Sequence, residues 1–591
     1  MNSTINAVDF YKTGHGPQYP SGTEYVYSNL TPRSVKYAST DRITVFGIQS
    51  FIAKRLIKEF NDTFFNQPLN TVIQKYQRRM DNALGKGTVT TKHLKDLHNL
   101  GFLPMHIKAL PEGVSVKPLI PVMTMINTLP EFFWLTNYLE TVCSCDVWQP
   151  MTNMSVAREY FSLLTGFAED TGVDPEFVKV QAHDFSMRGM AGVEAAAASG
   201  AAHLAAGFTG TDCVPAIDYL EDWYFADSDK EMVGCSVPAT EHSVMCMGTK
   251  EDEQATFERI LDLYPQGIKS IVSDTWNLWQ VITEYAPNLR DKINAAKDIM
   301  SYEAYDYQEP CAGELQLAYQ KGFKVVKVAD KEYRAINTDL QGTVFLGTEI
   351  EAPVLIVPGK TVFRPDSGCP VKILTGYKAL TKYVFDSVEE AISHACDYPQ
   401  DTYDFEVFEV VGKVFVRLSD YKLVSEHEVK GVVELLWEQF PGLVNAKGYK
   451  ELTKVGAIYG DSITLERAEQ IMQRLKDKGF ASSNVVLGIG SFTYQYNTRD
   501  TYGMAVKATW GMVDGVPREI FKDPITDDGT KKSATGLLRV ELERAGNKLV
   551  PEYVLYDRQT KYEEGCGELR TVFLDGIHMN QQTLEEIRGT R

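Results

Sequence analysis

From about residue 151 onward, the chain repeats short apolar runs that each end in a small polar cluster before a helical stretch. This alternation is typical of parallel β/α folds, because consecutive parallel strands need a crossover connection that is usually a helix. Seven such units suit a barrel better than an open sheet. The pattern therefore predicts an α/β fold with an irregular (β/α) barrel of the TIM type. The polar clusters are His183-Asp184-Phe185, Gly210-Thr211-Asp212, Glu241-His242-Ser243, Ser273-Asp274, Arg364-Pro365-Asp366-Ser367-Gly368, Gly460-Asp461-Ser462 and Gly488-Ile489-Gly490-Ser491.

The regions around this pattern predict further domains. Residues 1–150 combine strand-like segments such as Tyr25 to Ser28 with an amphipathic helix, and they predict a mixed α+β domain. The predicted barrel core covers 151–520, and 521–591 form a C-terminal segment that we expect to pack with the N-terminal domain. The helical face of the N-terminal domain comprises Val45, Ile48, Ile52, Leu56 and Phe60.

Two stretches rich in Tyr, Phe and Val interrupt the predicted core, and we interpret them as β-rich insertions. They cover residues 303–358 and 377–440. In the second insertion, the run from Phe405 to Leu418 predicts a hairpin with its turn at Gly412. An Ala-rich helix from Ala195 to Ala206 has small residues that suggest close packing.

The net charge and the targeting signals of the chain indicate which kinds of molecule it can bind and where in the cell it is expected. The chain has 60 Lys and Arg against 79 Asp and Glu, so its net charge is −19. Such a chain is repelled by nucleic acid phosphates, and an anionic ligand needs a local cluster of cations. The first residues lack the basic and apolar regions typical of a signal peptide, and no window approaches about 18 uninterrupted apolar residues. The odd number of cysteines, nine, predicts reduced thiols. We therefore expect a cytoplasmic protein that binds neither nucleic acid nor membranes.

Three predicted strand ends suit a phosphorylated sugar. The segment from Arg364 to Gly368 offers a planar cation, the Asp366 carboxylate and a glycine that allows close approach to the backbone. The alternative is a turn closed by an Arg–Asp pair. Glycines and free amides around Gly460 and Ser491 are typical of phosphate cradles, although each segment is also compatible with a plain turn.

Basic and aromatic residues add to this picture. Arg499, Lys507 and Lys522 would form a positive patch for a polyphosphate if they meet, and otherwise they are unrelated solvated charges. Phe185 beside Arg188 could hold a flat heteroaromatic ring next to a phosphate; the alternative is a core phenylalanine and a surface arginine.

His242 lies in a polar loop beside Glu241, a carboxylate that could hold the tautomer of the imidazole. The sequence leaves three roles open for this histidine: a base, a phosphate acceptor, or a satisfied polar residue.

These motifs together resemble those of the nicotinamide phosphoribosyltransferase family, which are type II phosphoribosyltransferases. Additional matching motifs are Asp9-Phe10-Tyr11-Lys12-x-x-His15, Trp134-Leu135-Thr136-Asn137, Glu140-Thr141, Thr498-Arg499-Asp500 and Phe521-Lys522-Asp523-Pro524. The resemblance implies a pentosyltransferase of NAD salvage. Its reaction transfers phosphoribose from 5-phosphoribosyl-1-pyrophosphate (PRPP) to nicotinamide, which gives nicotinamide mononucleotide and pyrophosphate.

The resemblance also implies how the nicotinamide is held. Phe185 stacks on one face of the pyridine ring and the partner subunit's Tyr11 on the other, so the active sites are shared in a homodimer. Arg364 binds the carboxamide oxygen, and Asp212 accepts hydrogen bonds from the amide NH2.

For the other substrates the resemblance implies further roles. Asp366 and Asp461 hold the ribose, Gly460 and Ser491 hold the 5′-phosphate, and Arg188 lies over that phosphate. The pyrophosphate is surrounded, together with Mg²⁺, by Arg499, Lys507, Lys522 and the partner's Arg33. His242 is phosphorylated by ATP, and Glu241 orients it; the ligands of the metal ion are not indicated.

The chain departs from the family pattern at two positions. Asn277 stands where an aspartate is common, and Ser491-Phe492-Thr493 replaces a longer glycine run. Two alternatives to the nicotinamide enzyme remain: a nicotinate phosphoribosyltransferase and a non-catalytic binding or signalling protein of the same fold. Asp212 argues against the first, because a carboxylate repels the carboxylate of nicotinate.

Overall fold

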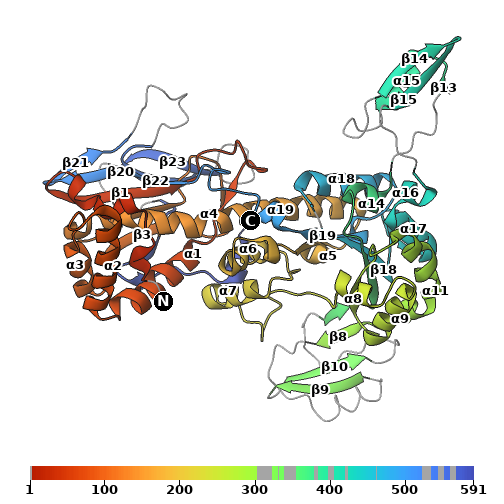
Figure 1. Ribbon diagram of the computed structural model, residues 1–591, viewed down its shortest axis with the longest axis horizontal. Coiled ribbons are helices and arrows are strands. Elements are labelled where there is room, and N and C mark those ends of the chain that lie inside the picture. Colours follow the sequence, from red (N-terminus) through yellow and green to blue (C-terminus); the bar gives the residue numbers. More distant parts are fainter. Residues whose placement is uncertain are drawn as a thin grey trace. The chain divides into compact units, whose positions relative to one another are not determined.

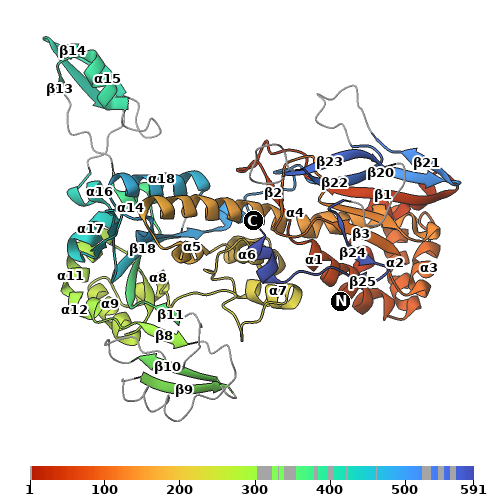
Figure 2. The same ribbon diagram turned by 180° about the vertical axis from the view of Figure 1, so that it is seen from behind.

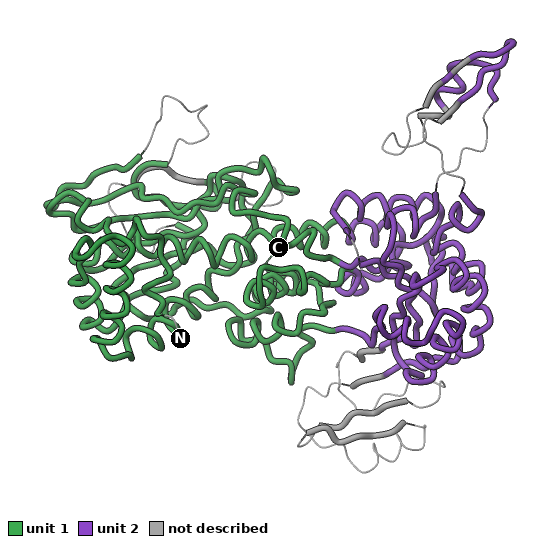
Figure 3. The backbone as a smooth tube through the Cα atoms, in the orientation of Figure 1, with its two compact units in different colours: residues 1–163, 182–235, 489–591 green, residues 164–181, 236–488 purple. Residues whose placement is uncertain are grey.

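The computed structural model forms two compact units, each built from separate stretches of the chain (Figure 3). Unit 1 comprises Met1–Leu163, Ala182–Cys235 and Ile489–Arg591, and unit 2 comprises Leu164–Gln181 and Ser236–Gly488. The domain boundaries that we predicted from the sequence stay a prediction. The structure describes residues 3–302, 323–329, 332–337, 354–377, 384–396, 405–418, 424–460, 462–521, 534–543, 552–559 and 567–590.

A seven-stranded antiparallel sheet organises unit 1 (Figure 1). The predicted strand at Tyr25 to Ser28 is confirmed as part of β1, which pairs with β20 on one side and β5 on the other. Near the end of the chain, β24 pairs with β3, and Figure 2 shows the β24–β25 hairpin beside that strand. The two ends of the chain therefore build one sheet. Its strands, in spatial order, are β21 (Val516–Glu519), β20 (Ala505–Val513), β1 (Thr23–Thr31), β5 (Met123–Asn127), β3 (Met105–Ala109), β24 (Arg570–Leu574) and β25 (Ile577–His578).

Helices cover one face of this sheet and bury the main core of unit 1 (Figure 1). The predicted amphipathic helix is confirmed, since Ile52, Leu56 and Phe60 are buried against sheet residues such as Met105 and Met123. On the other sheet face, a smaller cluster packs around Tyr27 and Trp510. The helices are α1 (Ile48–Ser50) with its π-helical continuations η4 (Phe51–Glu59) and η5 (Asn61–Phe65), α2 (Leu69–Leu84) and α3 (Lys92–Leu100); the short strands β2 (Ile43–Thr44) and β4 (Ser115–Val116) and the pair β22 (Leu537–Glu543) and β23 (Glu552–Gln559) complete this part.

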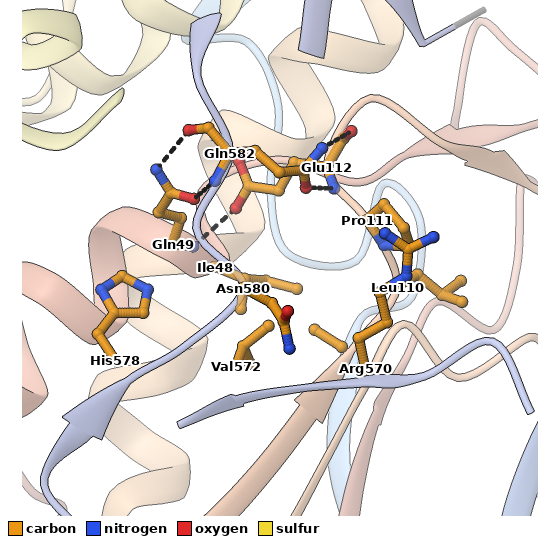
Figure 4. A pocket seen from close by; sticks show the side chains of 11 residues that line it. Ile48, Gln49, Leu110, Pro111, Glu112, Arg570, Val572, His578, Asn580 and Gln582 are labelled. Carbon is orange, nitrogen blue, oxygen red and sulfur yellow. Dashed lines mark hydrogen bonds between the residues drawn. The ribbon is translucent and has the colours of Figure 1, made fainter. Parts of the chain in front are cut away.

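A network of amide hydrogen bonds joins the C-terminal segment to the N-terminal region within unit 1 (Figure 4). The Gln582 backbone N–H donates to the Gln49 side chain at 2.7 Å, and the Gln49 amide donates back to the Gln582 carbonyl at 2.9 Å. The buried Glu112 carboxylate accepts from the Gln49 backbone N–H at 2.7 Å. These bonds hold the stretch before helix α20 (Leu584–Gly589) in place.

The remaining part of unit 1 contains a short run of parallel pairing. Residues Asp184 and Thr211 form one parallel bridge, and Gly210 and Cys235 form the next. The predicted Ala-rich helix is confirmed as α6, and Gly200 lies so close to α7 that an added Cβ would stand 2.7 Å from the Ala216 Cβ. The elements here are β6 (Ala182–Asp184), the 3₁₀ turn η7 (Met187–Gly189), α6 (Val193–Ala205), α7 (Val214–Tyr224) and α19 (Ser491–Tyr494), while α4 (Leu135–Thr171) begins in this unit.

Unit 2 is built on parallel strands in the order β19, β18, β12 and β7. These strands are strongly buried, as expected of a parallel sheet that is covered on both faces. Helix α18 contributes Ile471 and Leu475 to the core. The α/β class that we predicted is thus confirmed, whereas closure into one barrel stays a prediction. The bounds are β7 (Ile268–Val272), β12 (Lys360–Arg364), β18 (Val455–Tyr459), β19 (Val485–Ile489), α8 (His242–Met247), α9 (Glu253–Leu263), α10 (Leu278–Gln280), α11 (Ala286–Asn288), α12 (Arg290–Asn294), α14 (Pro370–Thr375), α16 (Glu426–Lys430), α17 (Val432–Gln439) and α18 (Leu465–Asp477).

Several small β pairs lie within the stretches that we interpret as insertions. The predicted hairpin is confirmed: β14 (Phe405–Val410) and β15 (Lys413–Leu418) are joined by Val411 and Gly412, both with positive φ, as in a type I′ turn. Most of 303–358 lies outside the described residues. The other elements inside the two stretches are β9 (Phe323–Ala329), β10 (Glu332–Asn337), β11 (Val354–Val357), β13 (Val384–Phe385) and α15 (Val388–Cys396), and helices α16 and α17 also fall within 377–440, so the end of the second stretch is helical. The short strands β8 (Ile299–Tyr302), β16 (Leu443–Val444) and β17 (Lys450–Glu451) lie just outside the two stretches.

One predicted strand is wrong. In the predicted alternation, the apolar run that precedes the His183 cluster and begins at Val178 would be a strand, but the structure has helix α5 (Pro175–Gln181) there, followed by the short β6. The Asp174 side chain accepts a hydrogen bond from the Glu176 backbone N–H at 3.0 Å, and Pro175 occupies the first turn. This is a strong helix start, and it overrides the β-branched residues that follow.

Candidate active site

In unit 2, the candidate site lies where the parallel strands β7 and β12 end. Arg364 is the last residue of β12 and is in register with Val272 of β7. Beyond them the Ser273 N–H donates to the Arg364 carbonyl at 3.0 Å, and the Asp366 N–H donates to the Asp274 carboxylate at 2.9 Å. The two strand ends are therefore locked together, and they present their charged side chains at one edge of the sheet.

The Arg364 guanidinium is largely buried and held on two sides. One Nη donates to the Thr240 carbonyl at 2.7 Å, and Nε lies 3.3 Å from the Asp366 carboxylate. The Nε–H makes no hydrogen bond with the described residues. Since a guanidinium has five donors, this geometry leaves donors for a ligand while the plane of the group is fixed.

Several charged and polar groups surround the Asp366 carboxylate. Burial raises its pKa, the positive charge of Arg364 lowers it, and the nearby carboxylate of Asp274 raises it again. The Gly460 backbone amide also acts on this carboxylate by hydrogen bonding, so the end of β18 belongs to the same cluster. Such an arrangement suits a ligand that brings hydroxyl donors to the carboxylates.

His242 is the first residue of α8, and its Nε2 lies 3.4 Å from Asp274 Oδ1. That carboxylate oxygen is buried and has no hydrogen bond among the described residues. Glu241, which we expected to orient the imidazole, instead contacts the Ser243 hydroxyl. Sequence reasoning assigned no role to Asp274, although its position directly after a predicted strand was a signal.

In unit 1, a second cluster joins Phe185 and Asp212 through His183. The His183 Nε2 lies 2.9 Å from Asp212 Oδ1, and the His183 and Phe185 rings are 4.9 Å apart between centroids. His183 is buried whereas the Asp212 side chain is about half exposed, at 46%. The cluster therefore places an exposed carboxylate, fixed by a buried imidazole, near an aromatic ring. In the sequence, His183 was only one residue of a motif, and its contact with Asp212 was not predicted.

Arg188 and Ser491 meet through Gly189. Arg188 is exposed on the turn η7, and Gly189 at the end of that turn packs directly on Ser491, the first residue of α19. A Cβ added at Gly189 would stand 2.1 Å from the Ser491 Oγ. The backbone here thus comes close to a hydroxyl and a guanidinium, both of which can bind a phosphate.

Three predicted cations lie around one end of the β1–β20 ladder. Lys507 is in register with Asn29, and the last β1 residue, Thr31, pairs with Ala505. Just beyond that end, Arg33 donates from Nε to the Gly503 carbonyl at 3.0 Å, in the loop that also carries Arg499.

Tyr11 lies on the short 3₁₀ helix η2 (Phe10–Gly14) of unit 1, and its side chain is exposed. Partial burial raises the pKa of the phenol, with further raising by Glu140 and Asp9, while Arg499 acts in the opposite direction. The phenol is therefore protonated at neutral pH and close to a cation of the predicted pyrophosphate patch.

The predicted site residues thus form groups within each unit. The unit 2 group is Glu241, His242, Arg364, Asp366 and Gly460, and the unit 1 residues are Tyr11, Arg33, Phe185, Arg188, Asp212, Ser491, Arg499 and Lys507. Asp461 and Lys522 lie outside the described residues. Asn277, one of the departures from the family pattern, caps α10 through a 3.4 Å bond from the Gln280 N–H.

The described part of the chain has neither a ready-made metal site nor a membrane-spanning helix. No group of three or more His, Cys, Asp or Glu side chains there could hold a metal ion by itself. Nor does any helix in the described ranges have the length and apolar character needed to cross a membrane.

Comparison with known proteins defines the class to which this fold and site belong. The model of the nicotinate phosphoribosyltransferase family matches residues 180–343 and 359–577, and the model of the nicotinamide phosphoribosyltransferase N-terminal domain matches residues 3–80. The chain belongs to the nicotinate phosphoribosyltransferase family.

Individual relatives carry a narrower name. A nicotinamide phosphoribosyltransferase of Acinetobacter baylyi is 46% identical, over 99% of this chain and 96% of its own length. Proteins of the same name from Mycoplasma pneumoniae and Xanthomonas campestris are 28% and 26% identical, over 90% and 100% of this chain and 94% and 98% of their own lengths.

Proposed function

We propose that this protein is a nicotinamide phosphoribosyltransferase, which makes nicotinamide mononucleotide and pyrophosphate from nicotinamide and PRPP. The observation that carries the proposal is the match along almost the whole chain to a relative of that name at 46% identity. The geometry around Asp212 supports it, because a half-exposed carboxylate beside Phe185 accepts hydrogen bonds from an amide but repels a carboxylate.

The reaction needs little proton transfer. The pyridine nitrogen of nicotinamide attacks C1 of the ribose with a lone pair and carries no proton, so no general base is required. Loss of pyrophosphate leaves positive charge on the sugar and negative charge on the leaving group. In our proposal, Asp366 faces the ribose, together with Asp461, and Arg364 faces the carboxamide oxygen.

The phosphate groups would be held in the proposal by backbone amides and cations. Gly460, Ser491 and Arg188 bind the 5′-phosphate. Arg499, Lys507, Lys522 and the partner's Arg33 surround the pyrophosphate with Mg²⁺. The donor set fits a Mg²⁺ ion bound mainly through phosphate oxygens, since such ions commonly use one or two carboxylates plus substrate phosphates.

We further propose that ATP phosphorylates His242 and so couples ATP hydrolysis to synthesis. With Nε2 directed at Asp274, a proton on Nε2 would satisfy the buried Oδ1 of that carboxylate. Nδ1 then carries the lone pair and is the ring nitrogen that accepts the phosphoryl group. Asp274 is thus the proposed positioning residue for the imidazole.

The proposed assembly is a homodimer in which the partner subunit's Tyr11 completes the nicotinamide site. Tyr11 supports this role because its ring is exposed on the surface of its own unit. Cytoplasmic localisation stays a prediction from the sequence.

The test compares nicotinamide with nicotinate as substrates of the purified full chain. We expect kcat/KM for nicotinamide to exceed that for nicotinate by at least about a hundredfold, because the carboxylate of nicotinate would lie against the Asp212 carboxylate and the two like charges repel. Asp212→Asn should reduce this preference by about tenfold or more, since it removes the repulsion. Equal rates with both substrates, or a preference for nicotinate, would contradict the proposal.

Two further arms address the alternatives. Arg364→Ala should abolish synthesis and leave the fold intact; synthesis at the wild-type rate would mean that the site is misplaced. His242→Ala should lose stimulation by ATP and keep some basal synthesis. If ATP still stimulates that variant, the phosphohistidine role is wrong.

A further inference from the structure

Two of the motifs that match the family pattern contain residues, other than Tyr11, that have no role in the reaction described above, and side-chain contacts join the two motifs. The first is the segment from Asp9 to His15, which carries Tyr11, and the second is the first part of helix α4. The contacts between them are the Asp9–Thr141, Lys12–Glu140, Lys12–Asn137 and His15–Asn137 pairs. We call these six residues the N-terminal clamp.

Lys12 is the centre of the clamp. Its side chain is only 2% exposed, and Nζ lies 2.6 Å from the Glu140 carboxylate and 3.2 Å from the Asn137 carbonyl, to which it donates. A buried ammonium needs such partners, because removal of either side leaves an uncompensated charge. The pair therefore holds the segment firmly against α4.

The outer contacts fix both ends of the segment. The Thr141 hydroxyl donates to the Asp9 carboxylate at 2.8 Å, and the His15 Nδ1 lies 2.6 Å from the Asn137 side-chain oxygen. The segment is therefore held against α4 at three residues: Asp9 before Tyr11, Lys12 next to it, and His15 after it.

The Tyr11 ring is exposed beside the clamp. Its side chain is 62% exposed, whereas its neighbour Lys12 is buried. The Lys12 Nζ lies 5.8 Å from the centroid of the Tyr11 ring, and the His15 ring meets that ring edge-on at 5.0 Å. Two residues of the clamp, Lys12 and His15, thus contact the Tyr11 ring and leave most of it exposed.

A cavity of about 620 Å³ borders the segment. It is lined by residues 10–14 and 16–18 of the segment and by parts of 84–96 and 131–138. Part of the segment borders open space instead of a packed core. The position of Tyr11 therefore depends largely on the contacts of the clamp.

We propose that Asp9, Lys12 and His15, held by Asn137, Glu140 and Thr141, are positioning residues that preset the Tyr11 ring for stacking on nicotinamide. The inference rests on the proposed function and deepens it. It assigns a role in nicotinamide affinity to residues that touch no substrate themselves.

The test is a double-mutant cycle between the clamp and Tyr11. Lys12→Met and Glu140→Gln should each raise KM for nicotinamide by about tenfold, with kcat within about threefold of wild type and KM for PRPP unchanged. In a chain that already carries Tyr11→Ala, neither Lys12→Met nor Glu140→Gln should raise KM for nicotinamide further, because the clamp acts only through the Tyr11 ring. Additive effects in the cycle, or unchanged KM in the single variants, would overturn the proposal.

Thr141→Val serves as a second variant, because its bond to Asp9 is exposed and its loss leaves the buried pair intact. We expect a smaller rise in KM, about two- to threefold. Lys92→Met is the matched control: Lys92 lines the same cavity and pairs with Asp96 on the exposed surface of α3, and it should leave KM unchanged. A similar rise in KM for nicotinamide in Lys92→Met would mean that the effect comes from the cavity wall, and it would overturn the proposed role of the clamp.

Hydrogen exchange gives a readout that is independent of turnover. Lys12→Met should accelerate amide exchange in residues 10–18 relative to wild type, while the strands β3 and β5 stay protected. Unchanged exchange in residues 10–18 would overturn the clamp even if the enzyme is active. Failure of the wild type to use nicotinamide would instead overturn the proposed function.

Discussion

At the scale of single residues, Glu253 shows how burial sets a titration. It is the first residue of α9, it is 2% exposed, and its Oε1 has no hydrogen bond among the described residues. This burial raises the pKa of the carboxyl from 4.5 to about 7, against a smaller opposing effect of Lys250. The folded protein therefore binds this proton more tightly than the unfolded chain does.

The pH dependence of stability follows from that difference. Between about pH 4.5 and 7 the folded state holds the proton that the unfolded state has lost, so the free energy of unfolding falls as pH rises through this window. Glu253→Gln removes the charge and should raise stability at pH 8 by about 1–3 kcal/mol, with little change at pH 4.5.

The measurement is the midpoint of thermal unfolding at both pH values. The matched control is Glu251→Gln, which changes an exposed carboxylate two positions away. An equal gain from both variants, or a gain at pH 4.5 as large as that at pH 8, would contradict the prediction.

At this scale, the chemistry of the predicted site residues could be inferred from the sequence, but their partners could not. Arg364, Asp366 and His242 were predicted because they lie in polar clusters at predicted strand ends, where β/α folds place their sites, and because the family resemblance gave them roles. Asp274 and His183 were not assigned, because their roles depend on contacts of 3.4 Å to His242 and 2.9 Å to Asp212. Such contacts join different strand ends and have no local signature.

At the scale of elements, the turn η7 and the helix α19 form a close junction. Gly189 has no Cβ, and an added one would stand 2.1 Å from Ser491 Oγ and 2.5 Å from Ser491 Cβ. Distances below 3.0 Å force a shift of the neighbour, so Gly189→Ala should displace Ser491 and with it the start of α19.

We therefore expect Gly189→Ala to raise KM for PRPP by about tenfold. Combined with Ser491→Gly, which removes the clash, it should raise KM no further than Ser491→Gly alone. The control is Gly166→Ala in α4, where an added Cβ meets no atom within 4 Å. Steady-state kinetics check the prediction, and strictly additive effects of the two changes would contradict it.

Elements were predicted well where turn chemistry is local. The hairpin at Gly412 has a two-residue turn with φ of 51° and 71°, a conformation that glycine adopts readily. Helix α5 was missed because the apolar run beginning at Val178 fits the strand pattern, whereas Asp174 and Pro175, which start the helix, were not considered.

At the scale of the whole molecule, the proposed nicotinamide site depends on a second copy of the chain. Arg364 lies in unit 2, whereas Tyr11 lies in unit 1 and is proposed to act in the partner's site. Each of the two substitutions Arg364→Ala and Tyr11→Ala should therefore impair a homodimer.

Mixed subunits should recover activity. A heterodimer with one Tyr11→Ala chain and one Arg364→Ala chain has one wild-type site, in which Arg364 and Tyr11 come from different chains. Random mixing makes about half of the dimers mixed, so roughly a quarter of wild-type activity should return. The measurement is activity after co-expression with two affinity tags. Absence of recovery in purified mixed dimers would contradict the shared site, and a monomeric chain would contradict the dimer.

The sequence by itself determined the α/β class, the polar strand ends and the resemblance to one family, because periodicity and motifs are written in neighbouring residues. Only the tertiary structure decided which distant residues meet. It paired β24 with β3, Lys12 with Glu140, and His242 with Asp274. The physical reason is that these contacts depend on how packed elements bring remote backbone together, and local propensity carries no information about which of many polar partners a buried charge will find.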